Sequence, residues 1–165
     1  MAKGSSRAQA IQFRDAIGAA EYLQLKAGLQ AIKSGEGRGQ ITAANPAALL
    51  GSVMIDDDCR RPPFAQDPRW DYVVGYARGR QAIAHFIEVH SAETSNVADI
   101  DKKLRWLRDF LLRDRQKKLA ALPREYHWVA SGRVNIPKHL PQFRFLNTTL
   151  RKIGLRGPMP RLALT

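Results

Sequence analysis

The sequence has little of several features, and each scarcity excludes a class of protein. Its 165 residues include one cysteine, Cys59, so no intramolecular disulfide can form and a zinc site would need other ligands. No run of about 18 apolar residues occurs, as a membrane span would require. No apolar segment follows the short basic N-terminus, as a signal peptide would require. We therefore expect a cytoplasmic protein with no membrane partner.

Acidic residues are also scarce relative to basic ones. The chain has 27 Lys and Arg against 15 Asp and Glu, a net charge of +12 and a pI near 10.4, and no acidic residue follows Glu125. A positive surplus attracts polyanions, so nucleic acid is the first partner to consider. Basic domains without a specific partner also exist, and charge alone does not separate the two.

The composition and the apolar spacing predict one α/β domain. With 44% hydrophobic residues the chain can bury a core of ordinary size. Residues 1–7 are expected to be a flexible N-terminus, and residues 8–165 a single domain. Apolar periodicity, β-branched runs and Gly or Pro breaks predict the order helix, hairpin, helix, strand, helix, at residues 8–32, 70–76 with 82–90, 96–119, 126–136 and 140–153.

Three polar residues in the predicted hairpin are candidates for chemistry. Side chains alternate along a strand, so Glu88 and His90 share one face. Asp71 lies on the neighbouring strand among apolar residues, where an ionised carboxylate is costly unless it is paired. If the hairpin brings Asp71 beside Glu88, their repulsion invites a divalent cation. Mg²⁺ suits such oxygen ligands, with His90 orienting or deprotonating a water, whereas Mn²⁺ would also accept His90 as a ligand.

The same residues also allow an interpretation without metal. Asp71 could pair with Arg69 or Arg80, Glu88 with a basic residue of the following helix, and His90 could be a hydrogen-bonded histidine at the strand end.

The tryptophans and the histidines give no further candidate site. The three tryptophans lie in apolar predicted elements, which favours core packing over base stacking: Trp70, Trp106 and Trp128. The four histidines do not have the spacing of zinc ligands: His85, His90, His127 and His139.

The order of elements, with an Asp and then a Glu-x-basic pattern in the hairpin, resembles the PD-(D/E)XK nuclease superfamily. Asp71, Glu88, Val89 and His90 carry the resemblance. It implies a restriction-endonuclease-like fold, in which a mixed central sheet is flanked by helices, and Mg²⁺-dependent phosphodiester hydrolysis. It also implies that Asp71 and Glu88 bind the metal with the carbonyl oxygen of Val89, and that Glu21 matches an additional carboxylate on the first helix of some members.

One position departs from the family pattern. His90 stands where the family has lysine, and a histidine is neutral about as often as charged near pH 7. Some members place the functional lysine elsewhere, so Lys102 or Lys103 on the next helix could reach the site. The residues around Asp71 and Glu88 also resemble a group of uncharacterised bacterial proteins of this fold that keep His at this position.

These observations lead to a metal-dependent nuclease as the first hypothesis, with Asp71, Glu88, His90 and Lys103 as catalytic residues and DNA or RNA as substrate. Binding is expected from basic residues of the second predicted helix and the C-terminal part: Lys102, Arg105, Arg133, Arg144, Arg151 and Lys152. The alternatives are an inactive nucleic-acid-binding or protein-interaction module on the same fold, and a small toxin-like or antitoxin-like protein with an acidic protein partner. An unpaired sheet edge would allow a homodimer.

Overall fold

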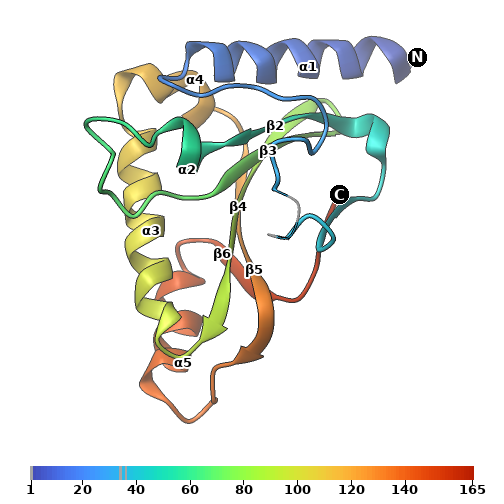
Figure 1. Ribbon diagram of the computed structural model, residues 1–165. Coiled ribbons are helices and arrows are strands. Elements are labelled where there is room, and N and C mark those ends of the chain that lie inside the picture. The colour runs from blue at the N-terminus through green and yellow to red at the C-terminus, as the bar shows by residue number, and fades with distance from the viewer. Residues whose placement is uncertain (1, 34, 36) are drawn as a thin grey trace.

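A mixed five-stranded sheet forms the centre of the protein (Figure 1). The computed structural model describes residues 2–33, 35 and 37–165. The strands lie side by side in the order β2-β3-β4-β5-β6. Their bounds are Leu49–Met54, Tyr72–Arg78, Gln81–Glu93, Arg124–Asn135 and Leu155–Met159.

The sheet changes from antiparallel to parallel at its central strand. β2, β3 and β4 form an antiparallel meander, with Tyr72 opposite Ile87 in the β3–β4 hairpin. β5 runs parallel to β4, and β6 runs parallel to β5. A parallel neighbour needs a crossover connection. α3 (Asn96–Leu111) supplies it between β4 and β5.

The α-helices cover one face of the sheet, with α1 lying across one end of it (Figure 1). Their apolar residues pack with one set of alternating strand residues, including Ala84, Phe86 and Trp128. α1 approaches the sheet closely, because the Phe13 ring occupies the space that a side chain at Gly75 would need. The remaining helical segments are α1 (Ala2–Ala19), α2 (Ile55–Asp58), α4 (Lys117–Ala120) and α5 (Pro141–Phe145), a π-helix over Leu146–Leu150, and 3-10 helices over Pro46–Ala48 and Asp114–Gln116.

The opposite face is covered by a small parallel pair of strands. β1 (Ile41–Ala43) pairs with β7 (Leu162–Leu164), which brings the C-terminal segment back to the N-terminal half. Ile41 and Leu164 pack there with Val74, Ile87 and Val129. The sheet is therefore buried on both faces.

The expected fold class is confirmed: the chain forms one α/β domain with a mixed central sheet flanked by helices. The hairpin, the strand near residues 126–136 and the helical segment before Gly154 are also present. All three tryptophans are buried, which confirms their predicted core role.

Two predicted helices are too long, and four strands were missed. The first helix ends at Ala19, and Lys26 instead forms a β-bridge with Ser52. Ile32 is buried on the opposite face of the sheet, so an irregular segment produces the same apolar spacing as a helix. The next predicted helix ends at Leu111 rather than near Leu119. The missed strands are β1, β2, β6 and β7, which are short or contain Gly and Pro.

None of the helices in the described ranges is long and apolar enough to cross a membrane.

Candidate functional site

The structure brings three predicted site residues together on the helix-covered face. Asp71 precedes β3, Glu88 lies in β4 and Lys103 lies in α3. The Lys103 ammonium forms ion pairs with Glu88 Oε1 and, at 3.5 Å, with Asp71 Oδ1. The Glu88 side chain is fully buried, whereas those of Lys103 and Asp71 are 19% and 20% exposed. The cluster therefore reaches solvent on the side of Asp71 and Lys103.

Backbone groups fix both carboxylates. The hairpin register that pairs Tyr72 with Ile87 places Asp71 beside Glu88. The N–H of Asp71 donates to Glu88 Oε2 at 3.0 Å, and the N–H of Val89 donates to Asp71 Oδ2 at 2.9 Å. Each carboxylate is thus held by one backbone N–H and by the same ammonium group. This arrangement satisfies the requirement that a buried charge be paired and hydrogen-bonded.

The cluster contains ionisable groups whose pKa values are shifted. Burial raises the pKa of the Glu88 carboxyl well above its ordinary value, and the nearby charge of Asp71 raises it further. Burial also raises the pKa of Asp71, although Lys103 opposes the shift. For Lys103, burial lowers the pKa but the charges of Glu88 and Asp71 outweigh it, so the net pKa is raised. Lys103 therefore remains a cation at neutral pH.

The donor set suits a hard divalent cation. Two carboxylates from adjacent strands offer oxygen atoms to an ion such as Mg²⁺, which keeps several waters as further ligands. Lys103 already binds the oxygens that face it, so an ion must share them with the ammonium or displace it. Of the two helix lysines considered from the sequence, Lys103 is the one that pairs with both carboxylates.

His90 and Glu21 are not part of this group. His90 Nδ1 lies 3.1 Å from the carbonyl oxygen of Ser91, and the described residues include no hydrogen bond or ion pair between His90 and the cluster. Glu21 follows α1, and its N–H donates to Gln116 Oε1 at 3.1 Å. The resemblance implied that Glu21 lies on the first helix, but that helix ends at Ala19.

Arg69, which the sequence offered as a partner for Asp71, pairs with another residue. The Arg69 guanidinium pairs with Asp56 at 3.0 Å and donates to carbonyl oxygens of the loop before β3. The two acidic residues that follow Asp56 in the chain also have protein partners: Asp57 pairs with Lys33, and Asp58 accepts the N–H of Gln24.

A second polar cluster was missed by the sequence reasoning. His85 Nδ1 and His127 Nε2 lie 3.0 Å apart, and Glu125 Oε2 is 3.6 and 3.5 Å from them. Both imidazoles are almost fully buried. The residues belong to β4 and β5, 42 positions apart for the two histidines, so only knowledge of this parallel pairing could have revealed them.

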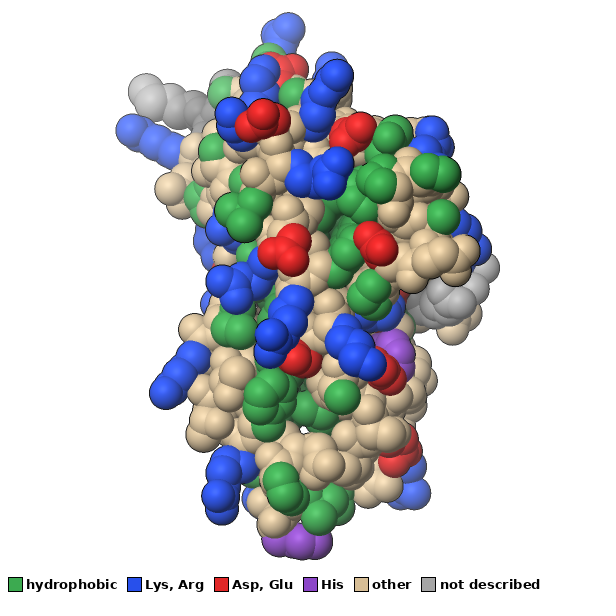
Figure 2. Space-filling view, turned by 90° about the vertical axis from the view of Figure 1, so that its left-hand side faces the viewer, with side chains coloured by type: hydrophobic (Ala, Val, Ile, Leu, Met, Phe, Trp, Pro, Cys, Tyr) green, Lys and Arg blue, Asp and Glu red, His purple; other side chains and the backbone are tan. Residues whose placement is uncertain are grey.

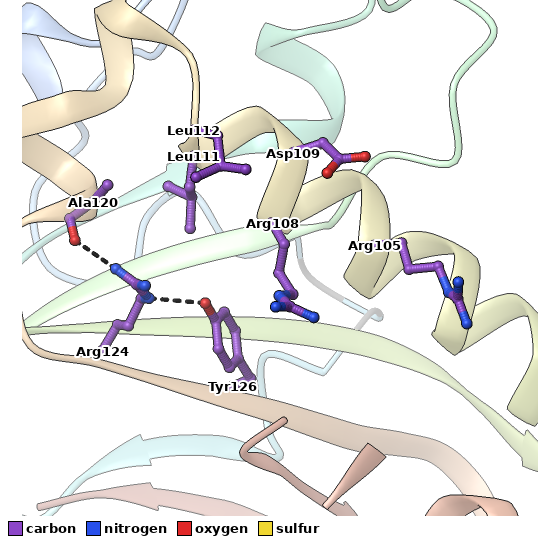
Figure 3. Close-up of a pocket in the computed structure, with 8 residues that line it drawn as sticks. All are labelled: Arg105, Arg108, Asp109, Leu111, Leu112, Ala120, Arg124 and Tyr126. Atoms are coloured by element: carbon purple, nitrogen blue, oxygen red, sulfur yellow. Dashed lines mark hydrogen bonds between the residues drawn. The ribbon is translucent and has the colours of Figure 1, made fainter. Parts of the chain in front are cut away.

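A basic depression lies beside α3. One of its cavities, about 450 Å³, lies between the C-terminal half of α3 and the start of β5 (Figure 3). Arg105 and Arg108 project from α3, and Arg124 extends from β5 with its Nε 2.9 Å from the hydroxyl oxygen of Tyr126. An adjoining cavity shares Arg108, Arg124 and Tyr126 and adds further basic residues, Lys152 and Arg156.

The six predicted nucleic-acid-binding residues are all exposed. Lysine and arginine side chains extend over the full height of the helical face, with acidic side chains among them (Figure 2). Arg105 is paired with Asp101 at 3.0 Å, so part of its charge is already compensated. The face is basic on balance but contains both signs of charge.

Comparison of the chain with protein-family models, curated proteins and solved structures finds no match.

Proposed function

We propose that the protein is a metal-dependent nucleic-acid phosphodiesterase whose site consists of Asp71, Glu88 and Lys103. The observation that carries the proposal is the convergence of these three side chains on the helix-covered face, with one carboxylate in β4, the other just before β3, and the largely buried ammonium of Lys103 paired with both. The element order supports it, because the helix, hairpin, helix and strand that carry the family resemblance are all present.

The residues of the site have distinct roles in the proposed reaction. Asp71 and Glu88 would hold Mg²⁺ or Mn²⁺, which supplies an activated water for attack on phosphorus and charge stabilisation at the phosphate. The backbone N–H groups of Asp71 and Val89 keep the carboxylates oriented. The positive charge of Lys103 would stabilise the negative charge that develops on the phosphate oxygens. His90 lies outside the cluster, so the proposal assigns it no direct contact with the cation.

The basic depression supports nucleic acid as the substrate. It brings Arg108 and Arg124 together on the same helix-covered face as the carboxylates. Positive side chains of this kind position a phosphate backbone without reading its sequence. The exposed Arg133, Arg144 and Arg151 extend the proposed binding surface into the C-terminal part. We place the protein in the cytoplasm, where its single thiol would stay reduced.

The alternative is a binding module without catalysis, and one specific observation favours it. Lys103 already forms ion pairs with both Glu88 and Asp71, and each carboxylate also accepts a backbone N–H, so every group of the cluster has a partner without a metal ion. In this case the carboxylates stabilise the fold and only the basic surface contacts nucleic acid.

Cleavage of single-stranded and duplex DNA and RNA in Mg²⁺ or Mn²⁺ tests the proposal. Wild type is compared with Glu88→Gln, and Glu93→Gln serves as a matched control because it alters an exposed carboxylate of the same strand. The proposal requires metal-dependent cleavage that Glu88→Gln loses and Glu93→Gln keeps. Equal inactivity of all three proteins, with nucleic-acid binding retained, would support the binding module instead.

Two further variants assign the basic group. Lys103→Met should abolish cleavage, whereas Lys117→Met, which removes a 75% exposed lysine, should not. His90→Ala should retain cleavage if Lys103 provides the positive charge. Loss of cleavage in His90→Ala with full activity in Lys103→Met would reverse the assignment. All comparisons require variants of matched folded fraction, measured by thermal melting.

A further inference from the structure

We propose that His85, Glu125 and His127 form a binding site for one divalent transition-metal ion of the Zn²⁺ class. This site is separate from the carboxylate cluster, and it does not depend on the proposed nuclease function. It lies on the other face of the sheet, because His85 precedes Glu88 by three positions on β4 and side chains alternate along a strand.

The spacing of the three facing atoms fits such an ion. His85 Nδ1, His127 Nε2 and Glu125 Oε2 are separated by 3.0, 3.5 and 3.6 Å. In a tetrahedral zinc site with bonds of about 2.0–2.1 Å, neighbouring ligand atoms lie about 3.3 Å apart. An ion about 2 Å from all three atoms therefore fits just outside their plane. The two longer separations exceed the usual length of an N–H···O hydrogen bond, so the carboxylate is near the rings without bonding to them.

The burial of the two imidazoles is otherwise poorly compensated. His85 and His127 are 1% and 2% exposed. Among the described residues, His85 Nε2 and His127 Nδ1 have no hydrogen-bond partner, so the rings gain a single hydrogen bond, to each other. Burying an unpaired polar group costs about 1–3 kcal/mol. An ion would replace this single hydrogen bond with two coordinate bonds, one to each facing nitrogen, while His85 Nε2 and His127 Nδ1 would stay without a partner among the described residues.

The types of ligand atom also decide which ion the site prefers. Nitrogen ligands favour Zn²⁺, Ni²⁺ or Co²⁺ over Mg²⁺. The cation at this site therefore differs from the one proposed for Asp71 and Glu88.

Two arginines form ion pairs with Glu125, the third proposed ligand. Arg78 binds Glu125 Oε1 at 2.8 Å and orients the carboxylate, while Arg156 binds Oε2 at 2.9 Å. Arg156 therefore competes for the ligand oxygen, and its charge repels an incoming cation. Its side chain is 60% exposed and can move aside. Glu125 and Arg156 border the same surface cavity of about 580 Å³, and 13% of the Glu125 side chain is exposed.

Titration of chelator-treated protein with Zn²⁺ and Co²⁺ tests the site. We expect one equivalent to bind, with a rise in melting temperature and the strong visible absorption of tetrahedral Co²⁺. Glu125→Gln and His127→Gln should each weaken binding at least about tenfold, because each loses a ligand. His139→Gln, which removes an exposed histidine outside the cluster, and Glu88→Gln, which removes a carboxylate of the other site, should both bind as wild type does.

Arg156→Gln provides a test with the opposite sign, and it needs no change to a buried residue. Removal of the competing charge should tighten Zn²⁺ binding by at least about threefold. The proposal is overturned if folded wild type takes up no stoichiometric Zn²⁺, if Glu125→Gln and His139→Gln bind equally well, or if Arg156→Gln binds no more tightly than wild type. Loss of binding in Glu88→Gln alone would assign the zinc to the carboxylate cluster instead.

Discussion

Replacement of Lys103 by methionine is the most direct test of the carboxylate cluster. Methionine keeps much of the apolar stem of lysine and removes the ammonium group. The variant leaves Glu88 fully buried and Asp71 largely buried, with no cation between them. Each carboxylate keeps one backbone hydrogen bond, so the loss is confined to charge compensation.

The size of the effect follows from the burial of the group. Removal of one partner from a buried ion pair costs about 3–5 kcal/mol. Lys103 and Asp71 are each about one-fifth exposed, which places the expected loss at the lower end, about 3 kcal/mol. The exposed pair between Lys117 and Asp114 is a reference, since such surface pairs contribute about 0–1 kcal/mol.

Urea unfolding of wild type, Lys103→Met and Lys117→Met, each with and without Mg²⁺, measures the loss of stability and the stabilisation by Mg²⁺. We expect Lys103→Met to lose about 3 kcal/mol in metal-free buffer. Mg²⁺ should then stabilise this variant more than wild type, because the ammonium no longer competes for the oxygens. At a hundredfold excess over the dissociation constant the gain is about 2.7 kcal/mol.

Two results would refute this reasoning. If Lys103→Met and Lys117→Met unfold at the same urea concentration, the ammonium does not compensate the charge of Glu88. If Lys103→Met is strongly destabilised but Mg²⁺ restores nothing, the cluster is a structural ion-pair network and the proposed metal site is wrong.

Three further predictions concern the core, the thiol and the basic surface. Gly75→Ala should lower the free energy of unfolding by about 1–3 kcal/mol, because a Cβ there would lie 2.6 Å from the Phe13 ring; unchanged urea unfolding would contradict this packing. Burial raises the pKa of the Cys59 thiol to about 12, so iodoacetamide at pH 8 should modify it only in urea, as mass spectrometry would show; rapid modification of the native protein would be inconsistent with the structure. Nucleic-acid affinity should fall steeply with salt, and Arg124→Ala should reduce the slope of log affinity against log salt by about one; an unchanged slope would place the phosphate backbone elsewhere.

The central hairpin was predictable because its signals are local. β-branched and aromatic residues flank Gly79, and the register of a short hairpin follows from the turn. The outer parts of the fold were not predictable in this way. The apolar residues near Ile32 contact the far face of the sheet, and β1 pairs with β7, more than a hundred positions away. Local periodicity contains no information about such contacts.

The two polar clusters differ in the same respect. Alternation along β4 and the hairpin indicated that Asp71 could lie beside Glu88, and the choice between the adjacent Lys102 and Lys103 remained open. The structure selects Lys103 by the direction in which α3 presents it to β4. His85 and His127 could not be paired from sequence, because the register of parallel strands joined by a helical crossover is not set by any turn.

The two clusters share a strand but not an environment. β4 presents Glu88 to the helix-covered face and His85 to the face covered by β1 and β7, so the sheet separates the groups although they are three residues apart. The cluster of Asp71 and Glu88 offers oxygen ligands beside the Lys103 ammonium. The cluster of His85 and His127 offers nitrogen ligands beside one carboxylate, so the two clusters should prefer different ions. The central strand β4 is hydrogen-bonded on both sides, so it holds Glu88 of one ligand set and His85 of the other rigidly, as a preorganised site requires. Selectivity between Mg²⁺ and Zn²⁺ would then follow from the alternation of side chains along a single strand.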